Sequence, residues 1–231
     1  MIRLTLTTGE FVGQQITITT PRPATPDAVA QAIAQLADRA QWDGPVGVAL
    51  PSVIKSQVAL TAANVDPAWV GTNAHELLSR HLSTTEISVL NDADAAGLAE
   101  VAFGAASIRE GAVVFLTFGT GIGSAFLYDG VLLPNTELGH LNFRGHESVE
   151  TWAATSARER EGLSWAEWAE RLQAFYSHIE FIFSPDLFVV GGGVSKNAGD
   201  FLPLLDLKTP IVPAIHRNNS GIIGAASLAG D

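Results

Sequence analysis

The chain has 231 residues, of which 47% are hydrophobic and 16% charged, a composition that is typical of a folded globular protein and excludes a disordered one. Its formal net charge of −11 argues against non-specific binding to nucleic acid or to an acidic membrane surface. The absence of cysteine excludes disulfides and thiolate metal ligands. Because no apolar run has the length of a membrane span and no signal-peptide pattern opens the chain, we expect a cytoplasmic protein.

The first half of the chain alternates between short apolar strands and helices. Residues 3–7 and 14–19 alternate apolar and polar side chains on either side of Gly9, which predicts a β-hairpin. Thr25 and Pro26 supply an N-cap and a first-turn proline for a helix. The further features expected here are a helix stop at 43–45, a strand at 46–50, a helix from Thr72 or Asn73 to about Leu82, a strand at 87–90 and an alanine-rich helix to about Phe103.

The second half repeats this alternation after a crossing segment at 104–111. The expected elements are strands at 112–118, 121–128 and 131–133, helices at 149–160 and 164–183, a strand at 187–190, a short helical segment near Asp200, a strand at 211–212 and a helix at 220–229. Ser164 and Glu167 have the spacing of a capping box. Strands joined by crossover helices, occurring twice, predict an α/β fold of two similar lobes with ligand sites at the strand ends.

A glycine-rich connection joins two apolar strands at residues 117–125, Thr-Phe-Gly-Thr-Gly-Ile-Gly-Ser-Ala. Glycine has no Cβ, so such a turn can reach positive φ and bring backbone N–H groups close to a ligand. Converging N–H groups suit an anion, and phosphate is the commonest biological one. Taken alone, the segment also fits an ordinary glycine-rich hairpin.

Asn91 and Asp92 follow the strand at 87–90 and open the next helix. Either residue, or Asp94, could simply be the helix N-cap. An aspartate at a strand end could instead accept the proton of a hydroxyl group that attacks phosphorus. Both interpretations stay open on the residues alone.

Further polar and glycine-rich segments lie at strand ends. Glu137 and His140 have a glycine in the two-residue segment between them and suit paired hydrogen bonds to neighbouring sugar hydroxyls, whereas two ligands without cysteine make a weak zinc site. The loop at 61–64 ends in Asn64, and 191–193 is a triple glycine after a strand. We expect Trp165 and Trp168 to pack the long helix rather than to stack on a base. The other histidines, expected on solvated surfaces, are His75, His81, His146, His178 and His216.

These segments are specific in combination. They are Thr-Ala-Ala-Asn at 61–64, Asn-Asp-Ala-Asp-Ala-Ala-Gly-Leu-Ala-Glu at 91–100, the glycine-rich connection at 117–125, Pro-Asn-Thr-Glu-Leu-Gly-His-Leu at 134–141, Ser-Pro-Asp-Leu-Phe-Val-Val-Gly-Gly-Gly-Val-Ser-Lys at 184–196 and Asn-Asn-Ser-Gly-Ile-Ile-Gly-Ala-Ala at 218–226. In this order they resemble the polyphosphate glucokinases, a branch of the ROK sugar kinases, from about Thr8 onward.

The resemblance implies an actin-like ATPase (ribonuclease H-like) fold of two lobes around a cleft, with residues 1–104 and 218–231 in one lobe and 105–217 in the other. It implies transfer of a phosphoryl group from polyphosphate and/or ATP to the 6-hydroxyl of glucose, with Mg²⁺ and a homodimeric assembly. Asp92 matches the general base. The residues that match glucose contacts are Asn64, Asn91, Asp92, Glu137, His140 and Glu150. Those that match donor contacts are Thr117, Gly119, Thr120, Gly121, Gly191, Gly192 and Gly193.

One departure concerns the start of the chain. Family members begin with a strand and an Asp-x-Gly-Gly-Thr turn, whereas Met1 falls after that turn and 3–7 corresponds to the following strand. The first strand of the N-terminal lobe is therefore expected to be absent, although it would lie near the middle of its sheet. Three explanations stay open: a shortened version of an active kinase, a catalytically silent glucose-binding paralogue, or replacement of the missing loop by another element.

The choice of donor also stays open. Long polyphosphate needs a track of basic side chains, and the chain has only 13 lysines and arginines. Those that lie near the motif loops are Lys55, Arg144, Lys196 and Arg217.

Overall fold

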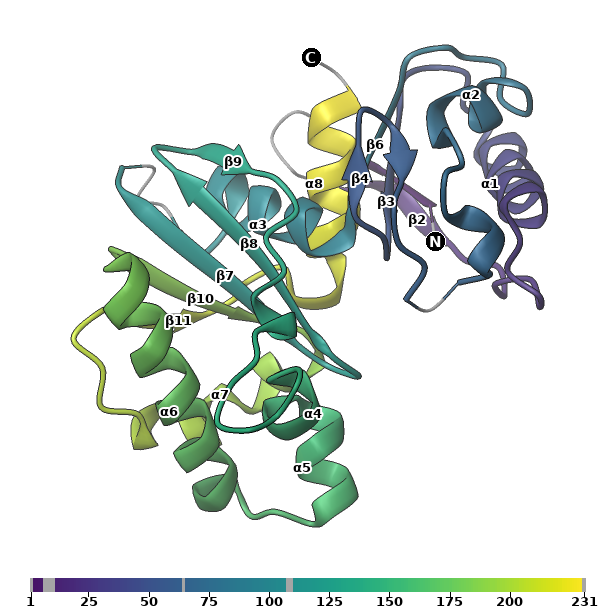
Figure 1. Cartoon of the computed structure of the whole chain (residues 1–231). Helices are drawn as coiled ribbons and strands as arrows, with labels where there is room; N and C mark the ends of the chain where they lie inside the picture. Colours follow the sequence, from purple (N-terminus) through teal and green to yellow (C-terminus); the bar gives the residue numbers. More distant parts are fainter. Residues whose placement is uncertain (1, 6–10, 64, 107–109, 230–231) are drawn as a thin grey trace. The chain divides into compact units, whose positions relative to one another are not determined.

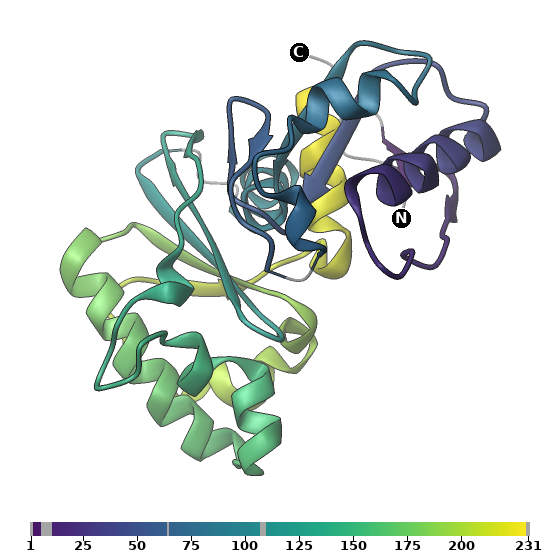
Figure 2. The ribbon, with the colours of Figure 1, turned by 45° about the vertical axis from the view of Figure 1, so that its right-hand side comes forward.

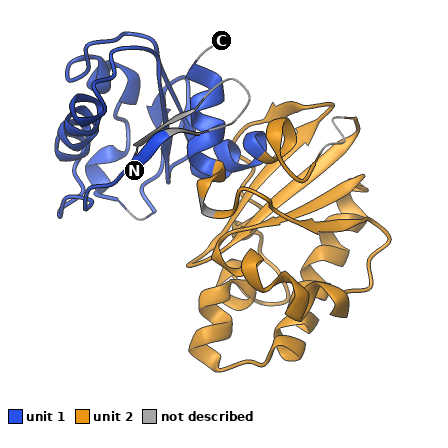
Figure 3. Ribbon diagram, turned by 180° about the vertical axis from the view of Figure 1, so that it is seen from behind, with its two compact units in different colours: residues 1–99, 221–231 blue, residues 100–220 orange. Residues whose placement is uncertain are grey.

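The computed structural model describes residues 2–5, 11–63, 65–106 and 110–229 (Figures 1 and 2). The chain divides into two compact units (Figure 3). Unit 1 comprises residues 1–99 and 221–231, and unit 2 comprises residues 100–220. Both contain strands and helices, so the expected α/β class is confirmed within each unit.

The described strands of unit 1 form separate two-stranded sheets. β1 (Ile2–Thr5) pairs antiparallel with β2 (Phe11–Ile16), and β3 (Val46–Leu50) pairs parallel with β6 (Ile87–Asn91). The connection expected around Gly9 lies outside the described residues. A small ladder joins β4 (Ile54–Lys55) to β5 (Val58–Ala59). Among the described residues no strand joins the β1–β2 pair to the β3–β6 pair, where the resemblance implies a central strand.

Helix α1 (Pro26–Ala40) begins as its sequence predicts. The Thr25 side chain accepts a hydrogen bond from the Ala28 N–H at 3.4 Å. The helix ends before the stop expected at 43–45, because Gln41 adopts a left-handed conformation and its N–H bonds back to the carbonyls of the last turn. Together with α2 (Ala74–Ser79), which Asn73 caps, α1 packs on the β3–β6 pair.

Small residues allow close packing around the start of α3 (Asp92–Phe103) in unit 1. Helix α8 (Ser220–Ala229) brings Gly224 against the Ala95 carbonyl, and its Ala225 carbonyl lies against Gly47 of β3. A Cβ at either glycine would overlap these carbonyl groups. The packing therefore fixes the first turn of α3, which carries Asp92, against β3 and α8.

Unit 2 is built on a five-stranded sheet in the order β11-β10-β7-β8-β9 (Figure 1). The bounds of its strands are β7 Ala112–Phe118, β8 Ile122–Tyr128, β9 Val131–Leu133, β10 Leu187–Gly191 and β11 Ile211–Pro213. β10 runs parallel to both β7 and β11, whereas β7, β8 and β9 form antiparallel pairs. The carboxyl ends of β7 and β10 consequently lie side by side, with Gly191 opposite Thr117.

Helix α6 (Trp165–Phe183) covers one face of this sheet (Figures 1 and 2). It opens with the predicted capping box between Ser164 and Glu167. As expected, Trp168 is fully buried, and its Nε1–H donates to the Ala153 carbonyl at 2.9 Å. No helix in the described part of the chain, α6 included, is long and apolar enough to cross a membrane.

The single helix expected at 149–160 is wrong. The structure has two short helices, α4 (Glu150–Ala153) and α5 (Thr155–Glu161), because Ala154 between them is extended with φ −66° and ψ 162°. A short helix α7 (Ala198–Phe201) occupies the segment predicted near Asp200. The break at Ala154 turns the start of α5 toward the connection between β7 and β8.

Candidate active site

The glycine-rich connection between β7 and β8 is held by Ser156. The Gly119 N–H first closes the turn by donating to the Gly121 carbonyl at 3.0 Å. Ser156 then donates its backbone N–H to the Gly119 carbonyl at 3.0 Å and its hydroxyl to the Thr120 carbonyl at 2.6 Å. Two carbonyl dipoles that would repel an anion are thereby engaged, while Gly119 and Thr120 stay exposed. This arrangement supports the anion-binding interpretation of the loop.

Sequence analysis missed Ser156. The sequence around Ala154 favours a continuous helix, since alanine is a good helix former. In a continuous helix, Ser156 would be predicted to be an ordinary residue on the helix surface. Its contribution depends on the break at Ala154, and only the tertiary hydrogen bonds to the loop reveal that break.

Glu150 joins the glycine-rich loop to His140. Its Oε2 accepts a hydrogen bond from the Ile122 N–H at 3.0 Å, and its Oε1 lies 3.6 Å from His140 Nε2. A Cβ at Gly121 would overlap Glu150 Oε2, so a glycine at this position allows the carboxylate to approach the loop. Glu150, which the resemblance matches to a glucose contact, is therefore central to the geometry of this part of unit 2.

His140 lies between two carboxylates. Its Nδ1 is 3.2 Å from Glu137 Oε2, on the opposite side of the ring from Glu150. The His140 side chain is 57% exposed, against 33% for Glu137 and 27% for Glu150. The three side chains offer carboxylate acceptors and ring nitrogens to solvent, a set that suits neighbouring sugar hydroxyls.

Two serines hold the segment that carries Glu137 and His140. Ser124 of β8 accepts the Leu138 N–H at 2.9 Å and donates to the Thr136 carbonyl. Ser148 donates its hydroxyl to the Gly139 carbonyl at 2.9 Å. Ser124 lies inside the motif at 117–125, but its spacing gave no sign of this contact. The backbone around His140 is thus fixed to the strand that leaves the glycine-rich loop.

The triple glycine follows β10 and packs beside the same loop. Gly192 has φ 83°, a left-handed conformation that favours glycine, and a Cβ there would overlap the Phe118 backbone. Since Gly191 is paired with Thr117, the turn lies against the last residues of β7. The structure therefore brings Gly191, Gly192 and Gly193 to the edge of unit 2 that carries Gly119, Thr120 and Gly121.

In unit 1, Asn91 is the cap of α3. Its Oδ1 accepts the N–H groups of Ala93 at 2.8 Å and Asp94 at 3.2 Å, and its Nδ2 donates to the Ser52 carbonyl at 3.1 Å. This settles which of the three candidates caps the helix. Ser52 is buried and donates to the Thr61 carbonyl at 2.7 Å, which ties the loop after β3 to the same place. Asn64 lies outside the described residues.

Asp92 is the first residue of α3 and does not take part in the Asn91 cap. Water reaches its side chain, yet the surrounding protein atoms remove part of the hydration of the carboxylate and so raise its pKa. Backbone hydrogen bonds from Ala93 and from Asp92 itself oppose this shift. A carboxylate with a raised pKa is a better proton acceptor at neutral pH than an ordinary aspartate.

The other histidines lie at the surface, as expected, but each is only partly exposed. They are His75, His81, His146, His178 and His216. Ring nitrogens of His75 and His216 bond to the carbonyls of Ile87 and Phe103, and His146 stacks on Trp152. An imidazole can donate a hydrogen bond to a backbone carbonyl and at the same time pack its carbon edge against other side chains. Composition does not reveal these contacts. No group of three or more His, Cys, Asp or Glu side chains that could hold a metal lies within the described ranges.

Comparison with known proteins assigns the family. The model described as "ROK family" matches residues 2–151. The chain is 48% identical over 221 residues to the polyphosphate glucokinase of Mycobacterium tuberculosis (strain CDC 1551 / Oshkosh), covering 96% of this chain and 83% of its relative. The polyphosphate glucokinase of Mycobacterium leprae (strain TN) is 47% identical over 218 residues, with 94% and 67% covered. The chain belongs to the ROK family.

Solved structures agree with this membership. The inorganic polyphosphate/ATP-glucomannokinase from Arthrobacter sp. strain KM matches with a TM-score of 0.90 and 49% identity, covering 98% of this chain and 92% of that one. The ROK family glucokinase from Streptomyces griseus matches with a TM-score of 0.79 over 96% and 93% of the chains, and at 20% identity it shows the fold alone. The resemblance to the polyphosphate glucokinase branch and the expected fold are thereby confirmed.

The contact between Gly121 and Glu150 gives a stability prediction. Gly121→Ala places a methyl group where Glu150 Oε2 lies, so the carboxylate must move and release the Ile122 N–H, and loss of this charged hydrogen bond should lower the free energy of unfolding by about 1–3 kcal/mol. Gly119→Ala is the matched control, because a Cβ there meets no atom within 4 Å. Urea unfolding of the two variants measures the difference. Equal stability of both variants would contradict the close approach of Glu150 to the loop.

Proposed function

We propose that the protein is a glucokinase that transfers a phosphoryl group from polyphosphate and/or ATP to the 6-hydroxyl of glucose. The observation that carries the proposal is the Glu150 carboxylate, which contacts His140 and accepts the Ile122 N–H beside the glycine-rich loop. A sugar-recognising cluster and a phosphate-binding turn are thereby joined through one side chain. The relatives at 48% and 47% identity, which are polyphosphate glucokinases, support the same activity.

In this proposal, hydrogen bonds from polar side chains of the motif segments hold glucose. Glu137, His140 and Glu150 of unit 2 contact neighbouring hydroxyls, and Asn64 of unit 1 contributes its amide. Asn91 can offer one Nδ2 hydrogen to the sugar. Its Oδ1 accepts the cap hydrogen bonds, and its other Nδ2 hydrogen bonds to the Ser52 carbonyl. We assign the lobes expected at 1–104 with 218–231 and at 105–217 to unit 1 (1–99 and 221–231) and unit 2 (100–220), respectively.

The chemistry assigned to these residues is an in-line displacement at phosphorus. Asp92 accepts the proton of the glucose 6-hydroxyl as its oxygen bonds to the terminal phosphorus of the donor. The phosphoanhydride bond breaks at the same phosphorus, and the leaving group is ADP or a polyphosphate shortened by one phosphate. The backbone N–H groups of Thr120 and Gly121 stabilise charge on the transferred group, and Gly191, Gly192 and Gly193 flank the rest of the donor.

Magnesium and location complete the proposal. Because the described residues hold no three-ligand metal cluster, we assign Mg²⁺ to the donor phosphates and water rather than to a protein cage. When bound, Mg²⁺ neutralises phosphate charge during transfer. Cytoplasmic location stays a prediction.

The role of Asp92 is tested by Asp92→Asn. Loss of the proton acceptor should lower kcat about 10²–10⁴-fold with little change in glucose affinity. Glucose 6-phosphate formation with each donor measures kcat, and calorimetry measures glucose binding. Asp27→Asn is the matched control, since Asp27 is also a first-turn helix aspartate. Turnover by Asp92→Asn equal to wild type excludes Asp92 as the base. Glucose binding by the wild type without product from either donor would favour a silent sugar-binding protein.

The raised pKa of Asp92 sets the sign of a pH effect on stability. Folding favours its protonated form, so the stabilisation is complete below the pKa of an unfolded aspartate and is lost as the pH rises through the folded-state pKa. Asp92→Asn should therefore become more stable relative to wild type between pH 4 and pH 8. Chemical unfolding at several pH values measures this change. A relative stability that falls with increasing pH would contradict the raised pKa.

We also propose a homodimer that uses an apolar surface of unit 2. β9 is the outermost strand of its sheet, and Phe126 of β8 contacts Phe183 at the end of α6. The exposed apolar residues of β8, β9 and the last turn of α6 are Tyr128, Val131, Leu133, Phe181, Ile182 and Phe183. An outer strand edge beside an apolar surface suits self-pairing about a two-fold axis.

Phe181 is 86% exposed and is the residue to change. If the surface joins two copies, Phe181→Lys should give the mass of one 24.3 kDa chain in light scattering, where the wild type gives twice that mass. Leu204→Lys, at an exposed apolar position elsewhere in unit 2, is the control and should stay dimeric. A monomeric wild type, or a dimeric Phe181→Lys, would rule out this interface.

A further inference from the structure

Ser52 is a buried polar residue just after the end of β3, and its hydrogen bonds lead to Asn91. Only 4% of the residue is exposed. Its hydroxyl donates to the Thr61 carbonyl at 2.7 Å, and its own carbonyl accepts a hydrogen from Asn91 Nδ2 at 3.1 Å. A buried polar group is costly unless hydrogen bonds satisfy it, so these contacts define the place of the side chain. Ser52, Thr61 and Asn91 thus form one chain of hydrogen bonds, the Ser52 network.

Thr61 makes a second bond to the same turn. Its Oγ1 accepts the Val53 N–H at 2.9 Å, and the neighbouring Leu60 N–H donates to the Val53 carbonyl at 2.8 Å. The Ser52 hydroxyl also lies 3.2 Å from that carbonyl, a longer contact than the one to Thr61. These bonds close the base of the hairpin formed by β4 and β5. The backbone of Ser52 therefore cannot shift without breaking hydrogen bonds on both sides.

The tip of the same hairpin is also held. Gln57 has a left-handed φ of 65°, and its Oε1 accepts the Val89 N–H of β6 at 3.1 Å. Its carbonyl accepts the Ala74 N–H at the start of α2 at 2.8 Å. Because β6 ends at Asn91, the hairpin is attached at its tip and at its base to the strand that carries this amide. The Ser52 carbonyl is consequently a fixed acceptor for Asn91.

The Asn91 amide has one orientation that satisfies all its partners. Its Oδ1 accepts the N–H groups of Ala93 and Asp94, whereas the Ser52 carbonyl needs a donor. A flipped amide would point its NH₂ group at two N–H donors and its oxygen at a carbonyl, so both contacts select the same orientation. Since the amide group is planar, the direction of its second Nδ2 hydrogen is then fixed as well.

We propose that Ser52 and Thr61 are positioning residues for sugar recognition. They hold the Ser52 carbonyl, this carbonyl holds the Asn91 amide, and the amide presents its second Nδ2 hydrogen to a glucose hydroxyl. The inference rests on the proposed function, in which Asn91 contacts glucose. A donor that is already oriented loses less conformational freedom when the ligand binds. The Ser52 network therefore raises the affinity for glucose without taking part in phosphoryl transfer.

The test measures glucose binding by Ser52→Ala and Thr61→Val. Each variant should bind glucose about fivefold more weakly in calorimetry and raise the glucose KM by the same factor, as expected for the loss of one ordinary hydrogen bond. Thr61 is exposed, so water can solvate its carbonyl in Ser52→Ala and the variant should fold. Thr61→Ser keeps the acceptor for the Val53 N–H and should restore the wild-type KM.

Two further variants of unit 1 serve as matched controls. Ser79→Ala and Thr72→Val each remove a hydroxyl bond to a backbone carbonyl, those of His75 and Ala68. Both bonds lie outside the Ser52 network. Both controls should keep the wild-type affinity for glucose, so a loss that Ser52→Ala shares with them is not a sign of positioning.

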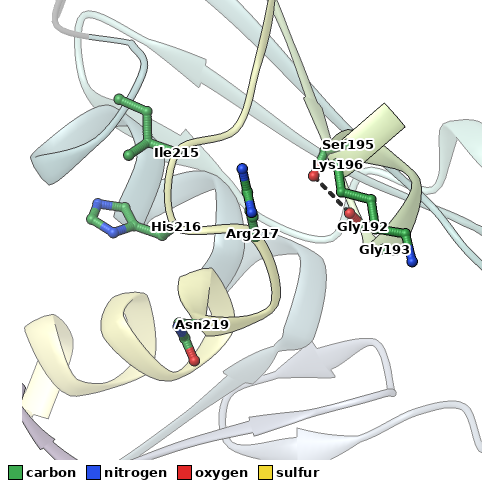
Figure 4. Close-up of a pocket in the computed structure, with 8 residues that line it drawn as sticks. All are labelled: Gly192, Gly193, Ser195, Lys196, Ile215, His216, Arg217 and Asn219. Carbon is green, nitrogen blue, oxygen red and sulfur yellow. Dashed lines mark hydrogen bonds between the residues drawn. The ribbon is translucent and has the colours of Figure 1, made fainter. Parts of the chain in front are cut away.

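The kinetic constants separate positioning from a general loosening of the fold. No residue of the Ser52 network lines the cavity of about 480 Å³ beside the triple glycine, where Gly192 and Gly193 lie (Figure 4). The KM for ATP and for polyphosphate should therefore stay within about twofold in Ser52→Ala. The kcat at saturating glucose should do the same, because a rise in KM at constant kcat marks a loss of binding alone.

A double-mutant cycle shows whether the effect passes through Asn91. Asn91→Ser keeps an oxygen that can cap α3 but has no amide hydrogen for glucose. In this background, Ser52→Ala should cause no further loss of glucose affinity, since residues that act through one contact are not additive. Two results overturn the proposal: a further fivefold loss in the Asn91→Ser background, or wild-type glucose affinity in Ser52→Ala.

Failure of the proposed function is distinguishable from failure of this inference. If the wild type binds glucose but forms no product, phosphoryl transfer fails, and calorimetry still tests the Ser52 network. If the wild type binds no glucose, sugar recognition fails. Hydrogen exchange of the Asn91 side-chain amide, followed by NMR, then tests the link to Ser52 by itself. Faster exchange in Ser52→Ala than in wild type supports the link, and equal rates overturn it.

Discussion

One carboxylate, that of Glu150, holds together the part of the candidate site that lies in unit 2. Glu150 accepts the backbone N–H of Ile122 with one oxygen and faces His140 with the other. A hydrogen bond to a carboxylate is stronger than one between neutral groups, so movement of the glycine-rich loop also moves the acceptor that orients the imidazole. The contact requires a glycine at position 121, because a side chain there would occupy the place of the carboxylate. The cluster that we propose recognises the sugar and the turn that we propose binds phosphate are therefore connected inside unit 2.

The strand pairing of unit 2 explains why distant motifs share one edge. Parallel pairing of β7 with β10 sets Gly191 opposite Thr117, although the two residues are far apart in the sequence. The break at Ala154 then lets Ser156 fix the carbonyls of the loop, and the Glu100 carboxylate accepts the backbone N–H groups of Ile215 and His216 after β11. Each of these contacts satisfies backbone groups rather than side chains. The edge is consequently rigid where a phosphate chain would have to be positioned, which is what phosphoryl transfer demands of a protein.

Local signals predicted most elements, and tertiary contacts account for the failures. The cap at Thr25 and the capping box at Ser164 mark helix starts through bonds within one turn, so the sequence reveals them. The break at Ala154 contradicts the helix propensity of the segment. It is accompanied by hydrogen bonds from Ser156 to the glycine-rich loop, which is distant in the sequence. The motifs likewise identified Glu137 and His140, but their meeting with Glu150 depends on how α4 packs beside β8. The two separate strand pairs of unit 1 agree with the expected absence of a central strand among the described residues.

A crystal structure of the full chain with glucose tests the central claim most directly. Glucose hydroxyls should lie at hydrogen-bonding distance, about 3 Å, from His140 and from the carboxylates of Glu137 and Glu150. Glu150 should still accept the Ile122 N–H, so that the sugar and the glycine-rich loop are held by the same side chain. Glucose bound without contact to these three residues, or bound with Glu150 released from Ile122, would contradict the account.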